Sequence, residues 1–84
     1  MLANFILYSR SYCHLCEDML AALRTLEREY AFSVEVVDVD ADAALVAQYD
    51  ELVPVLVGTK SGLSEQLCHY FFDEARVRGF LAKA

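Results

Sequence analysis

The sequence predicts a single α/β domain, residues 1–84, in which helices cover both faces of a mixed four-stranded sheet. The hydrophobic periodicity changes along the chain in the order strand, helix, strand, helix, strand, strand, helix. Only one connection between two consecutive strands is too short to contain a helix. The size agrees, because 84 residues with 57% hydrophobic side chains can build one core and leave no room for a second domain.

The first half of the chain contains two predicted strands joined by a helix. Residues 2–8 are apolar at almost every position, which is typical of a central strand buried on both faces. From Cys13 to Tyr30, apolar residues recur at three- and four-residue steps, which predicts an amphipathic helix of about four turns. Residues 32–39 begin with alternating apolar and polar side chains, as in a half-exposed strand nearer the sheet edge.

A short helix and a second buried strand follow. We expect Asp40 to be the N-cap of a helix that continues through Tyr49, with Asp42 in its positively polarised first turn. Residues 53–57 are a buried strand, and Pro54 lies at its start, where a missing N–H does least damage to the sheet.

The last part of the chain sets the direction of the remaining strands. Residues 58–62 are a predicted loop, residues 67–72 the last strand, and Asp73 the cap of a C-terminal helix. A helical crossover makes the first two strands of the chain parallel. The short loop at 58–62 can only make an antiparallel hairpin, so the sheet should be mixed.

Charge and cysteine content limit the classes of partner that we expect the protein to bind and the compartment in which we expect to find it. Thirteen acidic residues against seven Lys and Arg give a net charge of −6, which argues against nucleic acid and anionic membranes as partners. The apolar run near the N-terminus lacks a basic flank and is too short for a signal peptide or a membrane span. Three cysteines are too few for a secreted disulfide scaffold. We therefore expect a monomer in the cytoplasm.

Cys13 and Cys16 lie where the first strand has ended and the amphipathic helix begins. The thiolate is the reactive form of cysteine, and the N–H groups and partial positive charge of a helix start favour it. Cys13, at the helix edge, is placed to benefit. Cys16 is one turn further on the same face, so its sulfur can reach that of Cys13. The pair can open and close a disulfide.

Residues 8–16, which read Tyr-Ser-Arg-Ser-Tyr-Cys-His-Leu-Cys, resemble the active-site segment of glutaredoxins. Val53-Pro54 resembles the proline turn that faces this segment in the thioredoxin fold. The similarity extends over essentially the whole chain, most closely to the small bacterial glutaredoxin-like domains. It implies a thioredoxin-like fold of order β-α-β-α-β-β-α, with Cys13 as nucleophile and Cys16 as resolving thiol. It also implies a cis Val53–Pro54 peptide bond, an isomer that is common only before proline.

The same resemblance implies binding roles for residues around the cysteines. Arg10 occupies the position of a basic residue that meets the glutathione carboxylate in the family. Asp73 could meet the glutathione amine, and the resemblance places Tyr12, Val53 and Pro54 on the same substrate-binding surface.

Two positions depart from the glutaredoxin pattern. His14 stands where these proteins usually have proline, and a protonated imidazole beside Cys13 would stabilise its thiolate. The glycine pair that admits the γ-glutamyl end of glutathione is absent, because residues 69–74 read His-Tyr-Phe-Phe-Asp-Glu. His14 can therefore tune Cys13 or simply occupy an exposed turn, and the use of glutathione stays open.

We expect a thiol–disulfide oxidoreductase that acts on protein or small-molecule disulfides, needs no metal or organic cofactor, and has glutathione as a possible co-substrate. One alternative is a non-catalytic module that binds a protein or peptide with the Val53-Pro54 edge and residues 70–72. Another is zinc or iron–sulfur binding through Cys13 and Cys16, although a second Cys-x-x-Cys is missing. Cys68 is expected to be a small buried hydrophobe.

Overall fold

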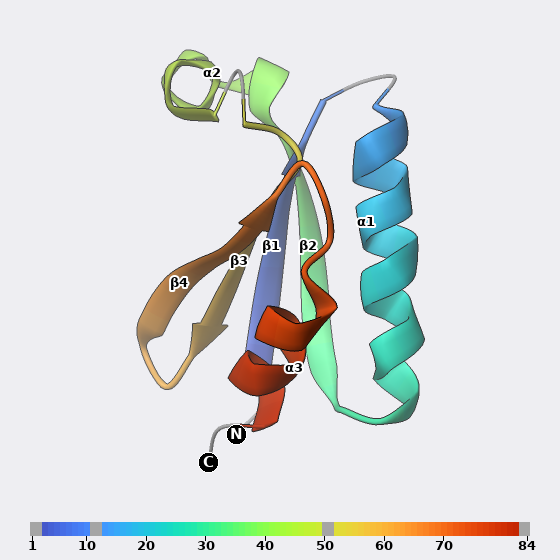
Figure 1. Ribbon diagram of the computed structural model, residues 1–84. Coiled ribbons are helices and arrows are strands. Elements are labelled where there is room, and N and C mark those ends of the chain that lie inside the picture. The colour runs from blue at the N-terminus through green and yellow to red at the C-terminus, as the bar shows by residue number, and fades with distance from the viewer. Residues whose placement is uncertain (1–2, 11–12, 50–51, 83–84) are drawn as a thin grey trace.

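The computed structural model describes residues 3–10, 13–49 and 52–82 (Figure 1). The elements occur in the predicted order β-α-β-α-β-β-α, with two short 3₁₀ helices added. The strands are β1 (Ala3–Ser9), β2 (Phe32–Asp38), β3 (Val55–Lys60) and β4 (Leu63–His69). The helices are α1 (His14–Thr25), η1 (Leu26–Arg28), η2 (Val39–Ala41), α2 (Ala43–Tyr49) and α3 (Glu74–Ala82). The predicted α/β fold class is confirmed.

The four strands form one sheet in the order β2-β1-β3-β4. Strand β1 is parallel to β2, and β3 is antiparallel to β4, as predicted. Strand β1 is antiparallel to β3. In the register of the sheet, Tyr8 near the end of β1 pairs with Val55 at the start of β3. The segment that leads to Cys13 follows the C-terminal end of β1, and the turn that contains Pro54 precedes the start of β3. Both therefore lie at the same end of the sheet.

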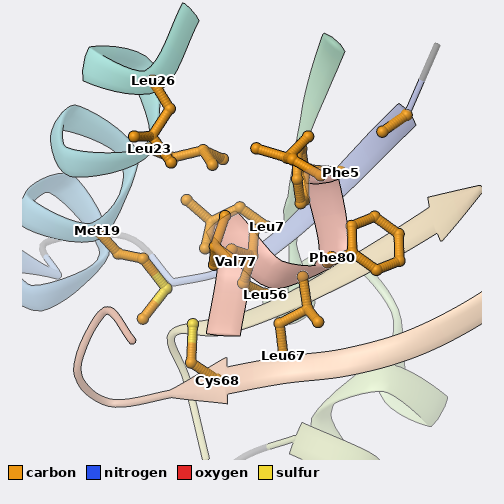
Figure 2. Packing of buried hydrophobic residues seen from close by; sticks show 12 residues of the cluster. Phe5, Leu7, Met19, Leu23, Leu26, Leu56, Leu67, Cys68, Val77 and Phe80 are labelled. Atoms are coloured by element: carbon orange, nitrogen blue, oxygen red, sulfur yellow. The ribbon is translucent and has the colours of Figure 1, made fainter. Parts of the chain in front are cut away.

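The main core lies on the face of the sheet that α1 and α3 cover. Figure 2 shows Phe5 and Leu7 of β1 meeting Leu23 of α1 and Val77 and Phe80 of α3. Leu23 and Val77 are completely buried. Burial of each such aliphatic side chain stabilises the fold by about 1.5–3 kcal/mol. The core thus holds α1, whose first turn carries Cys16, against the central strand β1.

In the part of the chain that the structure describes, a helix covers the opposite face near the end of β1. Tyr49 of α2 stacks on Tyr8, with ring centroids 4.4 Å apart, and buried Val39 and Val55 complete this smaller cluster. Burial, followed by the neighbouring Tyr8, raises the pKa of Tyr49 above its usual value. Helix α2 therefore covers the sheet at the C-terminal end of β1, from which the chain continues to the cysteines.

The prediction that the first strand is buried on both faces along its length is wrong at its N-terminal end. Asn4 is exposed, and its side-chain oxygen accepts a hydrogen bond from the Ser33 hydroxyl on β2. The seven residues of α2 span about 10 Å, roughly half the length of β1. Helices thus lie on both faces of the sheet, but this part of the second face is open and polar.

The N-cap predicted for the second helix is also corrected. Helix α2 begins at Ala43, and Asp42 is its cap, because the Asp42 carboxylate accepts the Ala44 N–H at 2.9 Å. Asp40 belongs to the preceding 3₁₀ helix η2, and its own N–H donates to the Asp38 carboxylate at 2.9 Å. A run of aspartates at every second position offers several caps, and the extra 3₁₀ turn moves the helix start by two residues. The Asp40 carboxylate thereby has another partner, described below.

The hairpin between β3 and β4 is tighter than the predicted loop at 58–62. The turn contains Ser61 and Gly62, both with positive φ, whereas Gly58 lies within β3. A Cβ atom at Gly58 would lie 2.7 Å from the Phe80 ring, so this glycine makes room for α3 and does not form the turn. Strand β4 ends at His69, before the predicted limit of 72, because Tyr70 has a φ of 63° and turns the chain.

Candidate redox site

Cys13 and Cys16 form a disulfide, with their Cα atoms 5.2 Å apart. Cys13 is the N-cap of α1 and has an extended backbone conformation, so its side chain lies at the helix start. Its sulfur accepts a hydrogen bond from the Cys16 N–H, with 3.0 Å between Sγ and N. Cys16 is 4% exposed and Cys13 is half-buried. The pair therefore has an outer sulfur, Cys13, and an inner one, Cys16.

The electrostatic environment of Cys13 contains opposing contributions. A backbone N–H directed at Sγ and the partial positive charge of the α1 start stabilise a thiolate. Glu17, in the first turn of α1, and Asp18 next to it are exposed and carry charge of the same sign as the thiolate. The N–H lies 3.0 Å from Sγ, whereas the two exposed carboxylates are screened by water, so this geometry favours the thiolate at Cys13.

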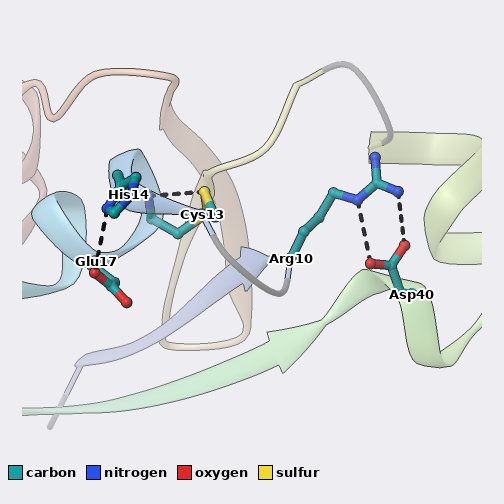
Figure 3. Close-up of a disulfide and its surroundings, with 6 residues drawn as sticks. Arg10, Cys13, His14, Glu17 and Asp40 are labelled. Carbon is teal, nitrogen blue, oxygen red and sulfur yellow. Dashed lines mark hydrogen bonds and ion pairs between the residues drawn. A yellow bond between two sulfur atoms is a disulfide. The ribbon is translucent and has the colours of Figure 1, made fainter.

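His14 lies at the start of α1 and points into solvent. Its side chain is 97% exposed, and its Nδ1 lies 3.9 Å from a carboxylate oxygen of Glu17 (Figure 3). A charge in that position is screened by water and offset by the carboxylate. His14 is adjacent to Cys13 in the sequence, but in the structure its ring is paired with the Glu17 carboxylate.

Arg10, which the sequence predicts to bind a carboxylate, binds one that belongs to this chain. Its Nη2 lies 2.9 Å from Oδ1 of Asp40, and its Nε lies 3.4 Å from Oδ2 of the same residue. Figure 3 shows the Arg10 side chain extending toward Asp40 and away from Cys13. The two side chains are 38% and 42% exposed. The predicted ligand-binding guanidinium is therefore engaged within the protein.

A small cavity of about 220 Å³ lies beside the disulfide. Its lining comes from the end of β1, the first two turns of α1 and the middle of β2, and consists of Leu7, Ser9, Arg10, Cys13, Cys16, Glu17, Leu20 and Val36. The cavity brings both sulfurs together with one cationic and one anionic side chain. Its apolar walls can accept the carbon chain of a group attached to a substrate sulfur.

The Val53–Pro54 peptide bond is cis, the isomer that the resemblance predicted. The Pro54 carbonyl accepts the Tyr70 N–H at 2.9 Å, which joins this turn to the segment after β4. The Val53 N–H donates to the Tyr49 carbonyl at 3.2 Å. The resemblance implies that Val53 lies on the substrate-binding surface, but its backbone N–H is already bonded to Tyr49, the last residue of α2, and is not open to a substrate.

Asp73 is the cap of α3, as predicted. Its carboxylate accepts the Arg76 N–H at 3.1 Å, and its carbonyl accepts the Val77 N–H. The glutathione-binding role expected for this carboxylate would compete with the cap. Tyr12, also expected on the substrate-binding surface, lies outside the described residues.

Cys68 is buried in the main core at 7% exposure, which confirms the expectation of a small buried hydrophobe. Burial raises the pKa of its thiol above the usual value, although the neighbouring backbone N–H of Asp73 acts in the opposite direction. Burial and the raised pKa make this thiol a poorer nucleophile than an exposed thiol.

Sequence reasoning expected a binding surface at residues 70–72 and missed Leu15 as an exposed apolar residue of the site. Leu15, between the two cysteines, is 38% exposed. Phe71 is 73% exposed and Tyr70 43%, on the segment that bonds to Pro54. The sequence signal was present for Tyr70 and Phe71, since aromatic residues at three consecutive positions, 70–72, cannot all face one core.

Within residues 3–10, 13–49 and 52–82, no three His, Cys, Asp or Glu side chains gather closely enough to hold a metal ion. In this same part of the chain, no helix is long and apolar enough to cross a membrane.

These features define a thioredoxin-fold protein: a mixed four-stranded sheet with a Cys-x-x-Cys pair at the start of its first helix and a cis-proline turn at the same sheet edge. The thioredoxin of Fasciola hepatica matches this fold with a TM-score of 0.66 at 19% identity, over 95% of this chain and 78% of its own. The family model of the glutaredoxin-like domain (DUF836) matches residues 4–82. The chain belongs to this glutaredoxin-like family.

Two further solved structures are similar in sequence as well as fold. A protein of Nitrosomonas europaea is 35% identical, with a TM-score of 0.86 over 98% of this chain and 94% of that protein. A protein of X. campestris is 36% identical, with a TM-score of 0.63 over 95% and 97% of the two chains. None of the curated proteins matches the sequence significantly. The comparisons confirm the resemblance on which the sequence-based expectations rest, and the Cys13–Cys16 pair supports a redox-type function.

Proposed function

We propose that the protein is a dithiol thiol–disulfide oxidoreductase that reduces or exchanges disulfides through Cys13 and Cys16. One observation supports this most directly. Cys13 is the N-cap of α1, and its sulfur accepts a backbone N–H while lying within bonding distance of the buried Cys16 sulfur. A thiolate stabilised at the outer position, with a second thiol behind it, is the arrangement that two-step disulfide exchange requires.

The reaction has two exchange steps. The Cys13 thiolate bonds to one sulfur of the substrate disulfide, the substrate S–S bond breaks, and the other sulfur leaves as a thiolate that takes a proton from water. Cys16 then loses its proton to solvent and attacks the Cys13 sulfur, which releases the second substrate thiol. Two electrons pass from the cysteine pair to the substrate, and the Cys13–Cys16 disulfide remains.

The remaining requirements of the cycle are also proposals. A thiol reductant must reopen the Cys13–Cys16 disulfide, and two molecules of glutathione could do so by becoming glutathione disulfide. The chemistry needs no metal or organic cofactor. The substrates are protein or small-molecule disulfides, and we place the protein in the cytoplasm as a monomer because its few cysteines fit a reducing compartment.

The experiment is reduction of a disulfide-bonded peptide by the reduced protein, with and without added glutathione. We expect one peptide disulfide to be reduced per protein molecule without glutathione, and repeated turnover when glutathione is present. A reduced protein that transfers no electrons to either a peptide or a small neutral disulfide would contradict the proposal.

A binding module is the second candidate, favoured by one observation. Phe71 is 73% exposed beside the Pro54 turn, and the exchange chemistry does not itself need an aromatic side chain there. Binding of an unstructured peptide that persists when both Cys13 and Cys16 are replaced by serine, without any disulfide reduction by the wild-type protein, would favour this candidate.

A further inference from the structure

In the part of the chain that the structure describes, β2 is an edge strand of the sheet, which has the order β2-β1-β3-β4 (Figure 1). It is regular, because all seven of its residues, Phe32–Asp38, pair with β1 without a register shift. The strand at the other edge, β4, has a register shift where it pairs with β3 at Leu56 and Val57. Such a bulge disrupts an edge as a template for another strand. The outer side of β2, here called the β2 edge, is therefore the better place for an added strand.

The C-terminal half of β2 borders the cavity beside the disulfide. Val36 lines this cavity together with Cys13 and Cys16. Val34, two residues earlier and therefore on the same face of β2, packs against the main core, whereas Val36 is 49% exposed. The cavity thus leaves an apolar side chain of the edge strand uncovered beside both sulfurs.

The charged side chains of β2 are acidic. Glu35 and Asp38 are exposed on this strand, and the sequence has no Lys or Arg between Arg28 and Lys60. An antiparallel pairing of two β2 strands centred on Glu35 would place the Glu35 carboxylates of the two copies opposite each other, which is unfavourable. The β2 edge therefore disfavours a second copy of this chain and favours a strand that carries Lys or Arg side chains.

We propose that the β2 edge binds the substrate, an extended cationic polypeptide segment that carries a disulfide and adds to β2 as a further strand. The backbone of the segment pairs with the outer N–H and C=O groups of β2, and an apolar side chain of the segment packs on Val36. The Val36 contact brings the disulfide to the cavity that Cys13 lines. The inference rests on the proposed function for the disulfide, but the docking itself can be tested without electron transfer.

The binding test adds a short linear peptide of alternating Val and Lys, with Ser in place of cysteine, to the oxidised full chain. The backbone amide signals of the protein are followed by NMR. We expect the signals of Phe32–Asp38 to shift and those of Leu63–His69 to stay in place. The same peptide with N-methyl groups on its backbone nitrogens should bind at least about 5-fold more weakly, because it loses backbone hydrogen bonds. A peptide of alternating Val and Glu should also bind more weakly.

Three variants locate the contact. Val36→Ser should weaken binding of the Lys peptide about 3-fold to 5-fold, through loss of a half-exposed apolar side chain. Glu35→Gln should reduce the preference for the Lys peptide over the Glu peptide about 3-fold. Leu63→Ser is the matched control, because Leu63 is 75% exposed on the other edge strand, and it should leave binding within about 2-fold. Circular dichroism establishes that each variant is folded.

The Lys peptide with its cysteine in a disulfide links docking to the reaction. The ratio of kcat/KM for this peptide to that for hydroxyethyl disulfide should fall about 3-fold in Val36→Ser and stay within about 2-fold in Leu63→Ser.

The outcomes for the inference and for the proposed function are distinct. Signal shifts confined to the Pro54 turn or to β4, or equal binding of the N-methylated peptide, would overturn the inference. Shifts in β2 that depend on protein concentration without peptide would identify a second copy as the occupant and also overturn it. Peptide binding at β2 by a protein that reduces no disulfide would support the β2 edge and contradict the proposed function.

Discussion

The Cys13 sulfur lies 3.0 Å from the backbone nitrogen of Cys16 and accepts its hydrogen bond. The residue that supplies the second thiol thus also supplies the N–H that stabilises charge on the first. This relationship follows from the N-cap position of Cys13, because a cap side chain reaches the N–H groups two or three residues on. It gives the two cysteines different chemistry although they are only three residues apart.

Cys13 should ionise at lower pH than Cys16 and than a free thiol. Cys13 lies at the exposed start of α1 and its sulfur accepts the Cys16 backbone N–H, whereas the Cys16 side chain is buried. The measurement is the pH dependence of the iodoacetamide rate at each cysteine. His14→Gln should move the Cys13 profile only slightly, since the His14 ring is 97% exposed and faces Glu17. A Cys13 profile identical to that of a free thiol would contradict this account of the helix start.

Phe71 should contribute to the reduction of protein disulfides but not of small ones. Phe71→Ser removes an exposed ring beside the Pro54 turn, which we expect to slow reduction of a protein disulfide by roughly fivefold, the value of about 1 kcal/mol of aromatic contact. Leu63→Ser is a matched control, because Leu63 is 75% exposed at the opposite end of β4. Equal effects of the two substitutions, or an effect on a small disulfide, would argue against a substrate contact.

Two glycine substitutions should have opposite effects on stability. Gly58→Ala places a Cβ atom 2.7 Å from the Phe80 ring and 2.9 Å from Leu67, and should lower the free energy of unfolding by about 1–3 kcal/mol. Gly79→Ala lies in α3 with nothing within 4 Å of the new atom, and should raise it by about 0.5–1 kcal/mol. Urea denaturation measures both. Stabilisation by Gly58→Ala would show that the packing of α3 on β3 is looser than described.

The free energy of unfolding should fall as pH rises above the ordinary pKa of a thiol. Burial raises the pKa of the Cys68 thiol and of the Tyr49 hydroxyl in the folded state. The unfolded chain then releases these protons at lower pH than the folded one, so their contribution is complete below the unfolded-state pKa and is lost as pH rises through the folded-state pKa. Melting temperatures of wild type and Cys68→Ala across alkaline pH measure this. The decline should be shallower in Cys68→Ala, and parallel curves would contradict the assignment to Cys68.

Cys68→Ala also has an expected outcome at neutral pH. Since Cys68 lies in the core and takes no part in the proposed exchange, its removal should leave the rate of disulfide reduction nearly unchanged while lowering stability slightly through lost packing. A loss of reduction rate in a variant with wild-type stability would give Cys68 a role in the reaction.

Patterns dictated by the backbone and the core could be predicted from the sequence. The order of elements, the mixed sheet, the helix start near Cys13 and the cap position of Asp73 follow from periodicity, short connections and capping side chains. The resemblance supplied the cis bond at Pro54. These features depend on local sequence or on a motif with one structural meaning.

Features decided by contacts between distant residues could not be predicted. Gly58 has the signature of a turn, but the ring of Phe80, 22 positions later, fixes its role in a strand. Arg10 has the signature of a ligand-binding cation, yet its partner is Asp40, 30 residues away. Asp40 in turn had the signature of a cap. No local pattern indicates which of these pairings the fold will make.

The most direct test of the exchange mechanism compares Cys13→Ser with Cys16→Ser. Each reduced variant is mixed with a disulfide-bonded peptide, and covalent protein–peptide adducts are measured by mass spectrometry. We expect Cys16→Ser to accumulate a stable mixed disulfide at Cys13 that added glutathione releases, and Cys13→Ser to form none, because only the outer thiol attacks first. Adducts that form equally in both variants, or in neither, would contradict the assignment of Cys13 as nucleophile and Cys16 as resolving thiol.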